Sequence, residues 1–93
     1  MITDSEQQLL AALSQAFGRK CFDTSSVLGR IWHANDLKLA KALDAAIPNC
    51  RYRSGYWHGH FKDGAVRHVL TRLAPQHFDT DRYGWWYLKS IQD

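Results

Sequence analysis

The sequence predicts a single domain that is mainly α-helical and ends in a β-hairpin. The chain has 93 residues, which is the length of one domain, so we take residues 1–93 as one folded unit. Apolar residues recur at helical spacing in four separate segments. The last of these segments is followed by a polar turn and by a run of aromatic residues that is typical of a strand.

The first helix is expected at residues 5–17. Apolar side chains repeat with a helical period between Leu9 and Phe17. Asp4 or Ser5 can cap the N-terminus, and Gln8 follows Ser5 at the spacing of a capping box. The segment therefore carries both a start signal and an apolar face that must pack on other elements.

Two further helices are expected at residues 24–34 and 37–47. The polar cluster from Asp23 to Ser26 can cap the first of them, and Asn35-Asp36 can cap the second. The helix at 37–47 should have an apolar face and a charged face on opposite sides. The apolar face consists of Leu37, Ala40, Leu43 and Ile47, and the charged face consists of Lys38, Lys41 and Asp44.

The fourth helix is expected at residues 63–74, after a connection at residues 49–61 that contains glycines and aromatics but no aliphatic side chain. Asp63 is the expected cap, and Pro75 is the expected end of the helix. A core-facing stripe at positions i, i+3, i+4 and i+7 is formed by Val66, Val69, Leu70 and Leu73.

The chain then predicts a hairpin over residues 77–88. Asp79 to Arg82 form a polar turn between His77-Phe78 and the aromatic run from Tyr83 to Leu88. Strand alternation would send Trp86 to one face, and Trp85 and Tyr87 to the other. We expect the hairpin and the helices at 5–17 and 63–74 to share one core.

The segment from Ala65 to Leu73, followed closely by Trp86-Tyr87-Leu88, resembles the end of small winged helix-turn-helix domains of phage and plasmid proteins. These include regulators and the C-terminal modules of primase-helicases. The resemblance implies three to four helices and a two-stranded wing, with residues 63–74 as the recognition helix. The helices at 24–34 and 37–47 are an alternative helix-turn-helix, in which Lys38 and Lys41 would face the groove.

The distribution of charge favours a polyanionic partner. The chain carries a net charge of +3 at neutral pH, and the excess of basic residues lies in its C-terminal half, mainly within residues 51–72. Most of the aromatic residues are interleaved with these basic side chains. The residues that we expect to contact DNA are Arg51, Arg53, Lys62, Arg67, His68, Thr71, Arg72 and Arg82.

The first functional hypothesis is therefore non-enzymatic binding of double-stranded DNA, as in a phage or plasmid regulator. The alternative is a small protein–protein interaction module, similar to phage-encoded inhibitors of host machinery such as anti-CRISPR proteins. That module would bind an acidic or nucleic-acid-binding protein through exposed aromatics, namely Trp57, Trp85 and Tyr87. Both hypotheses are compatible with a homodimer.

Other classes of protein have little support in the sequence. His58 and His60 could meet one ion, with Cys50 and His68 as further ligands, but their spacing matches no defined zinc motif. No nucleophile elbow or phosphate-binding loop is present. We expect no cofactor, no required metal, no catalytic residue and no membrane span. Because two cysteines are too few for a disulfide framework, we expect a cytoplasmic location.

Overall fold

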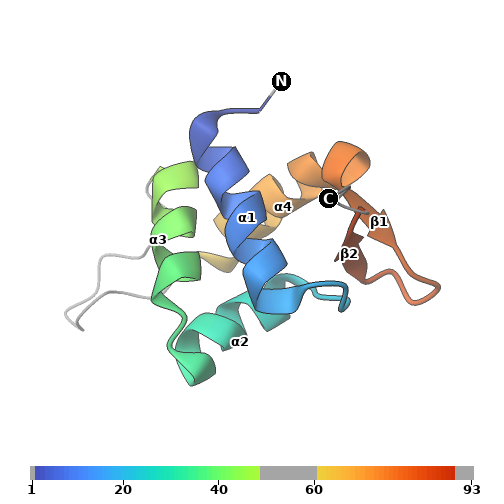
Figure 1. Ribbon diagram of the computed structural model, residues 1–93, viewed down its shortest axis with the longest axis horizontal. Helices are drawn as coiled ribbons and strands as arrows, with labels where there is room; N and C mark the ends of the chain where they lie inside the picture. Colours follow the sequence, from blue (N-terminus) through green and yellow to red (C-terminus); the bar gives the residue numbers. More distant parts are fainter. Residues whose placement is uncertain (1, 49–60, 90–93) are drawn as a thin grey trace.

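The computed structural model describes residues 2–48 and 61–89, and it confirms a mainly helical fold with a C-terminal hairpin. The elements in chain order are α1 (Asp4–Phe17), α2 (Thr24–Ala34), α3 (Leu37–Ala46), α4 (Asp63–His77), β1 (Phe78–Thr80) and β2 (Trp86–Leu88). The helix α3 and the hairpin lie at opposite ends of the molecule, with α1 and α4 between them (Figure 1). This arrangement is compatible with a winged-helix layout.

The N-terminus of α1 is capped by Thr3, and the predicted caps Asp4 and Ser5 are wrong. The Thr3 hydroxyl accepts a hydrogen bond from the Glu6 N–H at 3.1 Å, and the Glu6 carboxylate accepts one from the Thr3 N–H at 3.0 Å. The capping-box partner is therefore Glu6 and not Gln8. A carboxylate is favoured here because the N-terminus of a helix carries partial positive charge.

The structure confirms the predicted capping segments at the starts of α2 and α3. The Asp23 carboxylate accepts a hydrogen bond from the Ser26 N–H at 2.8 Å, and Asp36 does the same for the Leu39 N–H at 3.0 Å. Between the two helices, Asn35 adopts a left-handed conformation with φ of 54°, which asparagine tolerates better than most residues. The turn from α2 into α3 is thus short and fixed at both sides.

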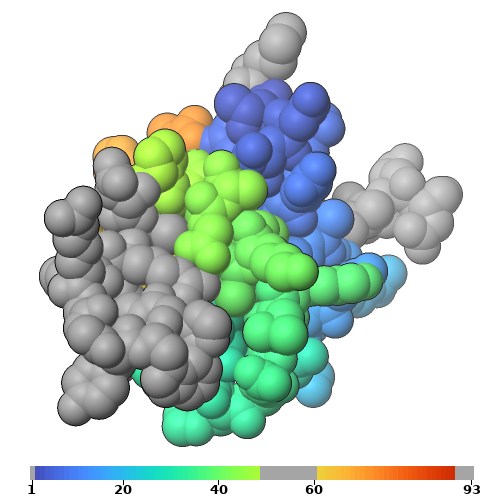
Figure 2. Space-filling view, turned by 90° about the vertical axis from the view of Figure 1, so that its left-hand side faces the viewer, coloured from blue at the N-terminus to red at the C-terminus, as the bar shows by residue number. Residues whose placement is uncertain are grey.

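The apolar face of α3 differs from the prediction at its first residue. Leu37 is 61% exposed, whereas Leu39, Ala40 and Leu43 are buried. Because Leu37 begins the helix directly after the turn, it lies outside the part of α3 that packs against α1. Figure 2, viewed from the α3 side, shows α1 and α3 lying against each other.

The helix α4 is longer than expected and begins differently. Its N-cap residue is Lys62, which makes no capping hydrogen bond through its side chain, and Asp63 is already in the first turn. Pro75 lies inside the helix, which continues to His77. Proline removes one N–H donor, but the carbonyl it would have bonded belongs to the exposed Thr71, where water can replace it.

The core is built from all four helices and the hairpin. The stripe on α4 is confirmed, because Val66, Val69, Leu70 and Leu73 are all buried. Leu9 and Leu13 of α1 are fully buried in the same cluster, and Trp86 of β2 packs against it. The predicted common core of α1, α4 and the hairpin is therefore confirmed.

The hairpin is attached to the first half of the chain by a short bridge that the sequence did not predict. The strands β1 and β2 are antiparallel, with Phe78 opposite Leu88. Phe22, between α1 and α2, exchanges two backbone hydrogen bonds with Trp86 at 2.7 and 3.0 Å. The Phe22 ring also stacks on Phe17 at 5.0 Å and meets Phe78 edge-on at 5.3 Å. Phe22 thus fixes the hairpin to the helical body.

Candidate nucleic-acid interface

The outward side of α4 carries three of the residues that were predicted to contact DNA. The buried stripe turns one side of the helix toward the core, so Arg67, His68 and Thr71 are left exposed on the other. Gly64 lies on the same side, and the space next to its α-carbon is open. The outer side of α4 therefore carries a cation, an imidazole and a hydroxyl that are all accessible to a partner.

Arg67 is engaged only weakly within the protein. Its guanidinium lies 3.6 Å from the Asp63 carboxylate, one helical turn earlier. The two side chains are 65% and 58% exposed, and an exposed pair of this kind contributes about 0.3–0.5 kcal/mol. Arg67 can therefore exchange Asp63 for another anion at little cost.

A hollow of about 210 Å³ lies beside α4, between the helix and the hairpin. Arg67 and Thr71 form the α4 side of this hollow, and Gly84 and Trp86 form the hairpin side. The remaining wall is the start of α2, contributed by Asp23, Thr24 and Ser25. The fold therefore brings Arg67 and Thr71, two of the predicted contact residues, next to the hairpin.

The turn of the hairpin is held by one carboxylate. Asp81 accepts hydrogen bonds from the N–H groups of Tyr83 and Trp85, both at 2.9 Å. Partial burial by itself would raise the pKa of Asp81, but the backbone donors and the thiol of Cys21 outweigh that effect and lower the pKa. Gly84 supplies the positive φ of 85° that the turn needs. Asp81 therefore stays anionic at neutral pH while its carboxylate holds the turn together.

The tip of the hairpin exposes a cation and two aromatic rings. Arg82 is exposed, and its guanidinium lies 5.8 Å from the centre of the Tyr83 ring. Tyr83 is 77% exposed and Trp85 is 43% exposed. Aromatic side chains are the kind that carry much of the binding energy where a protein interface forms. Tyr83 was not predicted as a contact, although strand alternation puts it on the same face as Trp85 and Tyr87, which were.

Arg72, another predicted DNA contact, has a partner within the protein. Its guanidinium forms an ion pair with the carboxylate of Glu6 in the first turn of α1. The Glu6 side chain is only 4% exposed, whereas that of Arg72 is 53% exposed. Arg72 therefore compensates a buried charge and ties α4 to α1. Sequence periodicity could not pair these two residues, because they are far apart in the chain.

The other predicted residues are distributed differently. Lys62 is half-buried at the start of α4, and Tyr87 is half-buried in β2. Lys38 and Lys41, the cations of the alternative helix-turn-helix, are exposed on α3 at the opposite end from the hairpin. Outside the described residues lie Arg51, Arg53, Trp57, His58, His60 and Cys50.

The described residues contain no cluster of three or more His, Cys, Asp or Glu side chains that could hold a metal ion. Within residues 2–48 and 61–89, no helix has both the length and the apolar character that crossing a membrane requires. A comparison of the chain with protein-family models, with curated proteins and with solved structures finds no match.

Proposed function

We propose that this domain binds double-stranded DNA without catalysing a reaction, with α4 as the helix that enters the major groove and the hairpin as its wing. The proposal rests on one observation, a hollow that is lined on one side by Arg67 and Thr71 of α4. Gly84 and Trp86 of the hairpin line its other side. A cytoplasmic location, favoured by the low number of cysteines, belongs to the same proposal.

The chemistry of these groups suits a duplex. The exposed Arg67 can form paired hydrogen bonds with the O6 and N7 atoms of guanine, and Thr71 can contact a phosphate or the methyl group of thymine. Arg82 at the hairpin tip can reach a phosphate or the minor groove.

The test is the affinity for a fluorescent duplex of about 30 base pairs, measured by anisotropy at ~50 and ~200 mM salt. Arg67→Ala should weaken binding and make the slope of log K against log salt shallower by about one unit. The matched control is Arg30→Ala, because Arg30 is also an exposed arginine in a surface ion pair, with Asp36 at 3.1 Å. Arg30→Ala should leave the affinity unchanged.

Two other results would contradict this assignment. If the duplex shows no binding at ~50 mM salt, where even non-specific binders associate, the domain does not bind DNA. If the double variant Lys38→Ala with Lys41→Ala weakens binding more than Arg67→Ala does, the helices α2 and α3 form the binding unit instead.

The second candidate function is a protein–protein interaction module. The exposed Tyr83 and Trp85 at the hairpin tip favour it, since aromatic side chains carry much of the binding energy in protein interfaces. This candidate predicts that Trp85→Ala abolishes binding to the partner whereas Arg67→Ala has little effect. If the domain instead binds DNA through α4, Arg67→Ala should weaken binding more than Trp85→Ala does.

A further inference from the structure

The tip of the hairpin presents an aromatic ring that the duplex contacts proposed above leave unused. The Tyr83 side chain is 77% exposed, and Trp85, two residues later, is 43% exposed. The guanidinium of Arg82 lies over the Tyr83 ring, 5.8 Å from its centre, which is the separation of a cation–π contact. The ring is therefore supported on one face and open to a flat partner on the other.

The turn that carries this ring is held by its own hydrogen bonds. The Asp81 carboxylate accepts from the N–H groups of Tyr83 and Trp85, both at 2.9 Å. In the backbone, the Asp81 N–H donates to the Trp85 carbonyl at 2.9 Å, and the Gly84 N–H donates to the Asp81 carbonyl at 3.1 Å. Because the turn is already ordered, little conformational freedom is lost when a partner binds to the ring.

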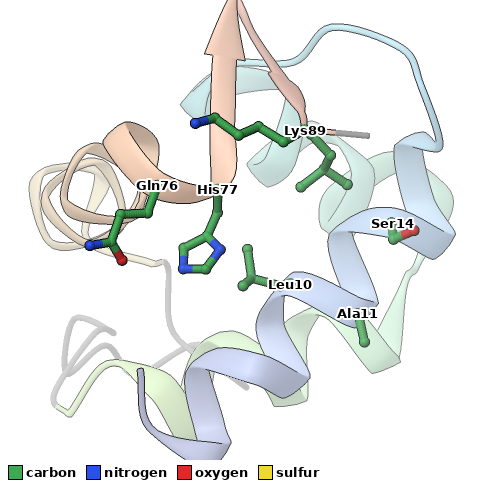
Figure 3. Close-up of a pocket in the computed structure, with 7 residues that line it drawn as sticks. Leu10, Ala11, Ser14, Gln76, His77 and Lys89 are labelled. Carbon is green, nitrogen blue, oxygen red and sulfur yellow. The ribbon is translucent and has the colours of Figure 1, made fainter. Parts of the chain in front are cut away.

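The base of the hairpin is fixed as well. The strand β1 continues directly from α4 after His77, and Lys89 lies beside this junction (Figure 3). The Lys89 N–H donates to the His77 carbonyl at 3.0 Å, and the Lys89 ammonium group donates to the Pro75 carbonyl at 3.3 Å. The hairpin is thus firmly attached to α4, and its tip projects beyond the helices (Figure 1).

The tip lies next to the surface that is proposed to hold the duplex. Gly84 and Trp86 line the hollow beside Arg67, and Tyr83 and Trp85 are their immediate neighbours in the chain. A DNA molecule that is seated at Arg67 therefore comes close to the exposed rings.

The charge of the tip favours a nucleobase over a phosphate. From Phe78 to Leu88 the sequence has two acidic residues, Asp79 and Asp81, and one basic residue, Arg82. Because the carboxylates oppose a phosphate, a contact with the backbone of DNA alone gains little at the tip. The face of a base is neutral, and any base can stack on an aromatic side chain. In a paired duplex these faces are covered by neighbouring bases, so an unpaired base is the group that fits the open ring.

We propose that Tyr83 stacks on an unpaired base at the end of a bound duplex, so that the preferred DNA is a duplex with a single-stranded extension. This rests on the proposed DNA binding and specifies the form of the DNA. The helix α4 would hold the paired part through Arg67. The hairpin tip would receive an unpaired base on the Tyr83 ring, with Arg82 behind the ring.

The test uses anisotropy with a fluorescent blunt duplex of about 30 base pairs, at ~50 mM salt. The same duplex is also measured with an unpaired extension of about ten nucleotides, on either strand. The wild type should bind an extended duplex about tenfold more tightly than the blunt one. An extension of abasic nucleotides, which keeps the phosphates but has no bases, should give no such gain.

Tyr83→Leu removes the ring but keeps an apolar side chain, so it should abolish the preference for the extension and leave the affinity for the blunt duplex unchanged. The matched control is Trp32→Leu, because Trp32 is an exposed aromatic residue of α2, and this variant should keep the preference. Arg67→Ala should weaken binding to both DNAs by the same factor, which separates the role of α4 from that of Tyr83.

Equal binding of the blunt and extended duplexes by the wild type would overturn the inference and leave the proposed DNA binding intact. A preference that survives in Tyr83→Leu, or that the abasic extension reproduces, would overturn it in the same way. If Tyr83→Leu weakens binding to the blunt duplex as much as to the extended one, the ring contacts paired DNA and the inference is wrong. If neither DNA binds, both proposals fail and a protein remains as the partner of the tip.

Discussion

The buried carboxylate of Glu6 and the guanidinium of Arg72 form an ion pair that joins the first turn of α1 to α4. The same carboxylate also completes the capping box with Thr3. One side chain therefore serves both the start of a helix and the contact between two helices. Arg72 consequently has a structural role, and we expect it to contribute less to DNA affinity than Arg67.

Arg72→Ala should lower the free energy of unfolding by about 3 kcal/mol, because it leaves the Glu6 carboxylate buried without a counter-charge. Urea denaturation at neutral pH measures this change. The matched control is Arg67→Ala on the same helix, whose exposed pair with Asp63 should contribute less than about 0.5 kcal/mol. The double variant Glu6→Gln with Arg72→Ala should be more stable than Arg72→Ala alone. Equal stability of these two variants would contradict the role of the buried charge.

Asp81 should make the stability of the protein depend on acidity. The pKa of Asp81 is lowered in the folded state by hydrogen bonds to the turn, which outweigh the effect of its burial. Its contribution is therefore present above the unfolded pKa, about 3.9, and is lost as the pH falls through the folded value.

The variant Asp81→Asn should be less stable than the wild type at pH 7, and the difference should become smaller toward pH 3. Urea midpoints at both pH values measure it. Asp79→Asn is the matched control, since Asp79 is an exposed carboxylate two residues earlier in the same hairpin. A difference for Asp81→Asn that does not change with pH would show that its charge has no part in holding the turn.

Cys21 should react slowly with alkylating reagents. Partial burial raises the pKa of the Cys21 thiol, and its hydrogen bond to Asp81 and the negative charge there raise it further. Since the thiolate is the reactive form, Asp81→Asn should increase the rate of carbamidomethylation by iodoacetamide at pH 8. Peptide mass spectrometry reports the rate at Cys21 separately from Cys50. An unchanged rate at Cys21 would contradict the contact with Asp81.

Leu70→Ala should lower the free energy of unfolding by about 2–5 kcal/mol, because Leu70 is fully buried in the core that α4 shares with α1. Chemical denaturation measures this loss. Leu37→Ala is the matched control, since Leu37 is a leucine that remains 61% exposed, and its removal should change the stability by less than about 0.5 kcal/mol. Similar losses for the two variants would mean that the apolar face of α3 begins at Leu37 after all.

The local features of the fold could be predicted from the sequence because they depend on neighbouring residues. The stripe from Val66 to Leu73 identified α4, and the carboxylates of Asp23 and Asp36 identified the starts of α2 and α3. The ends of α4 were less certain, because a helix can begin without a side-chain cap and tolerate Pro75 in its last turns.

The features that could not be predicted are contacts between distant parts of the chain. Periodicity places Arg72 on the outer side of α4, but only the packing of α1 brings Glu6 to it. In the same way, Asp81 is a polar turn residue in the sequence, and its contact with Cys21 depends on how the hairpin meets the helical body. The hollow beside Arg67 is a further product of tertiary packing, since its walls come from α2, α4 and the hairpin.

The bridge between Phe22 and Trp86 has a consequence for how the protein is made. Phe22 is fully buried, and the rings that contact it include those of Phe78 and Trp86, near the other end of the sequence. While the ribosome has produced only the first three helices, the side chain of Phe22 has no hairpin to cover it. The nascent chain therefore exposes more of this aromatic side chain to association with other chains until β2 emerges. The last step of folding follows synthesis of the hairpin.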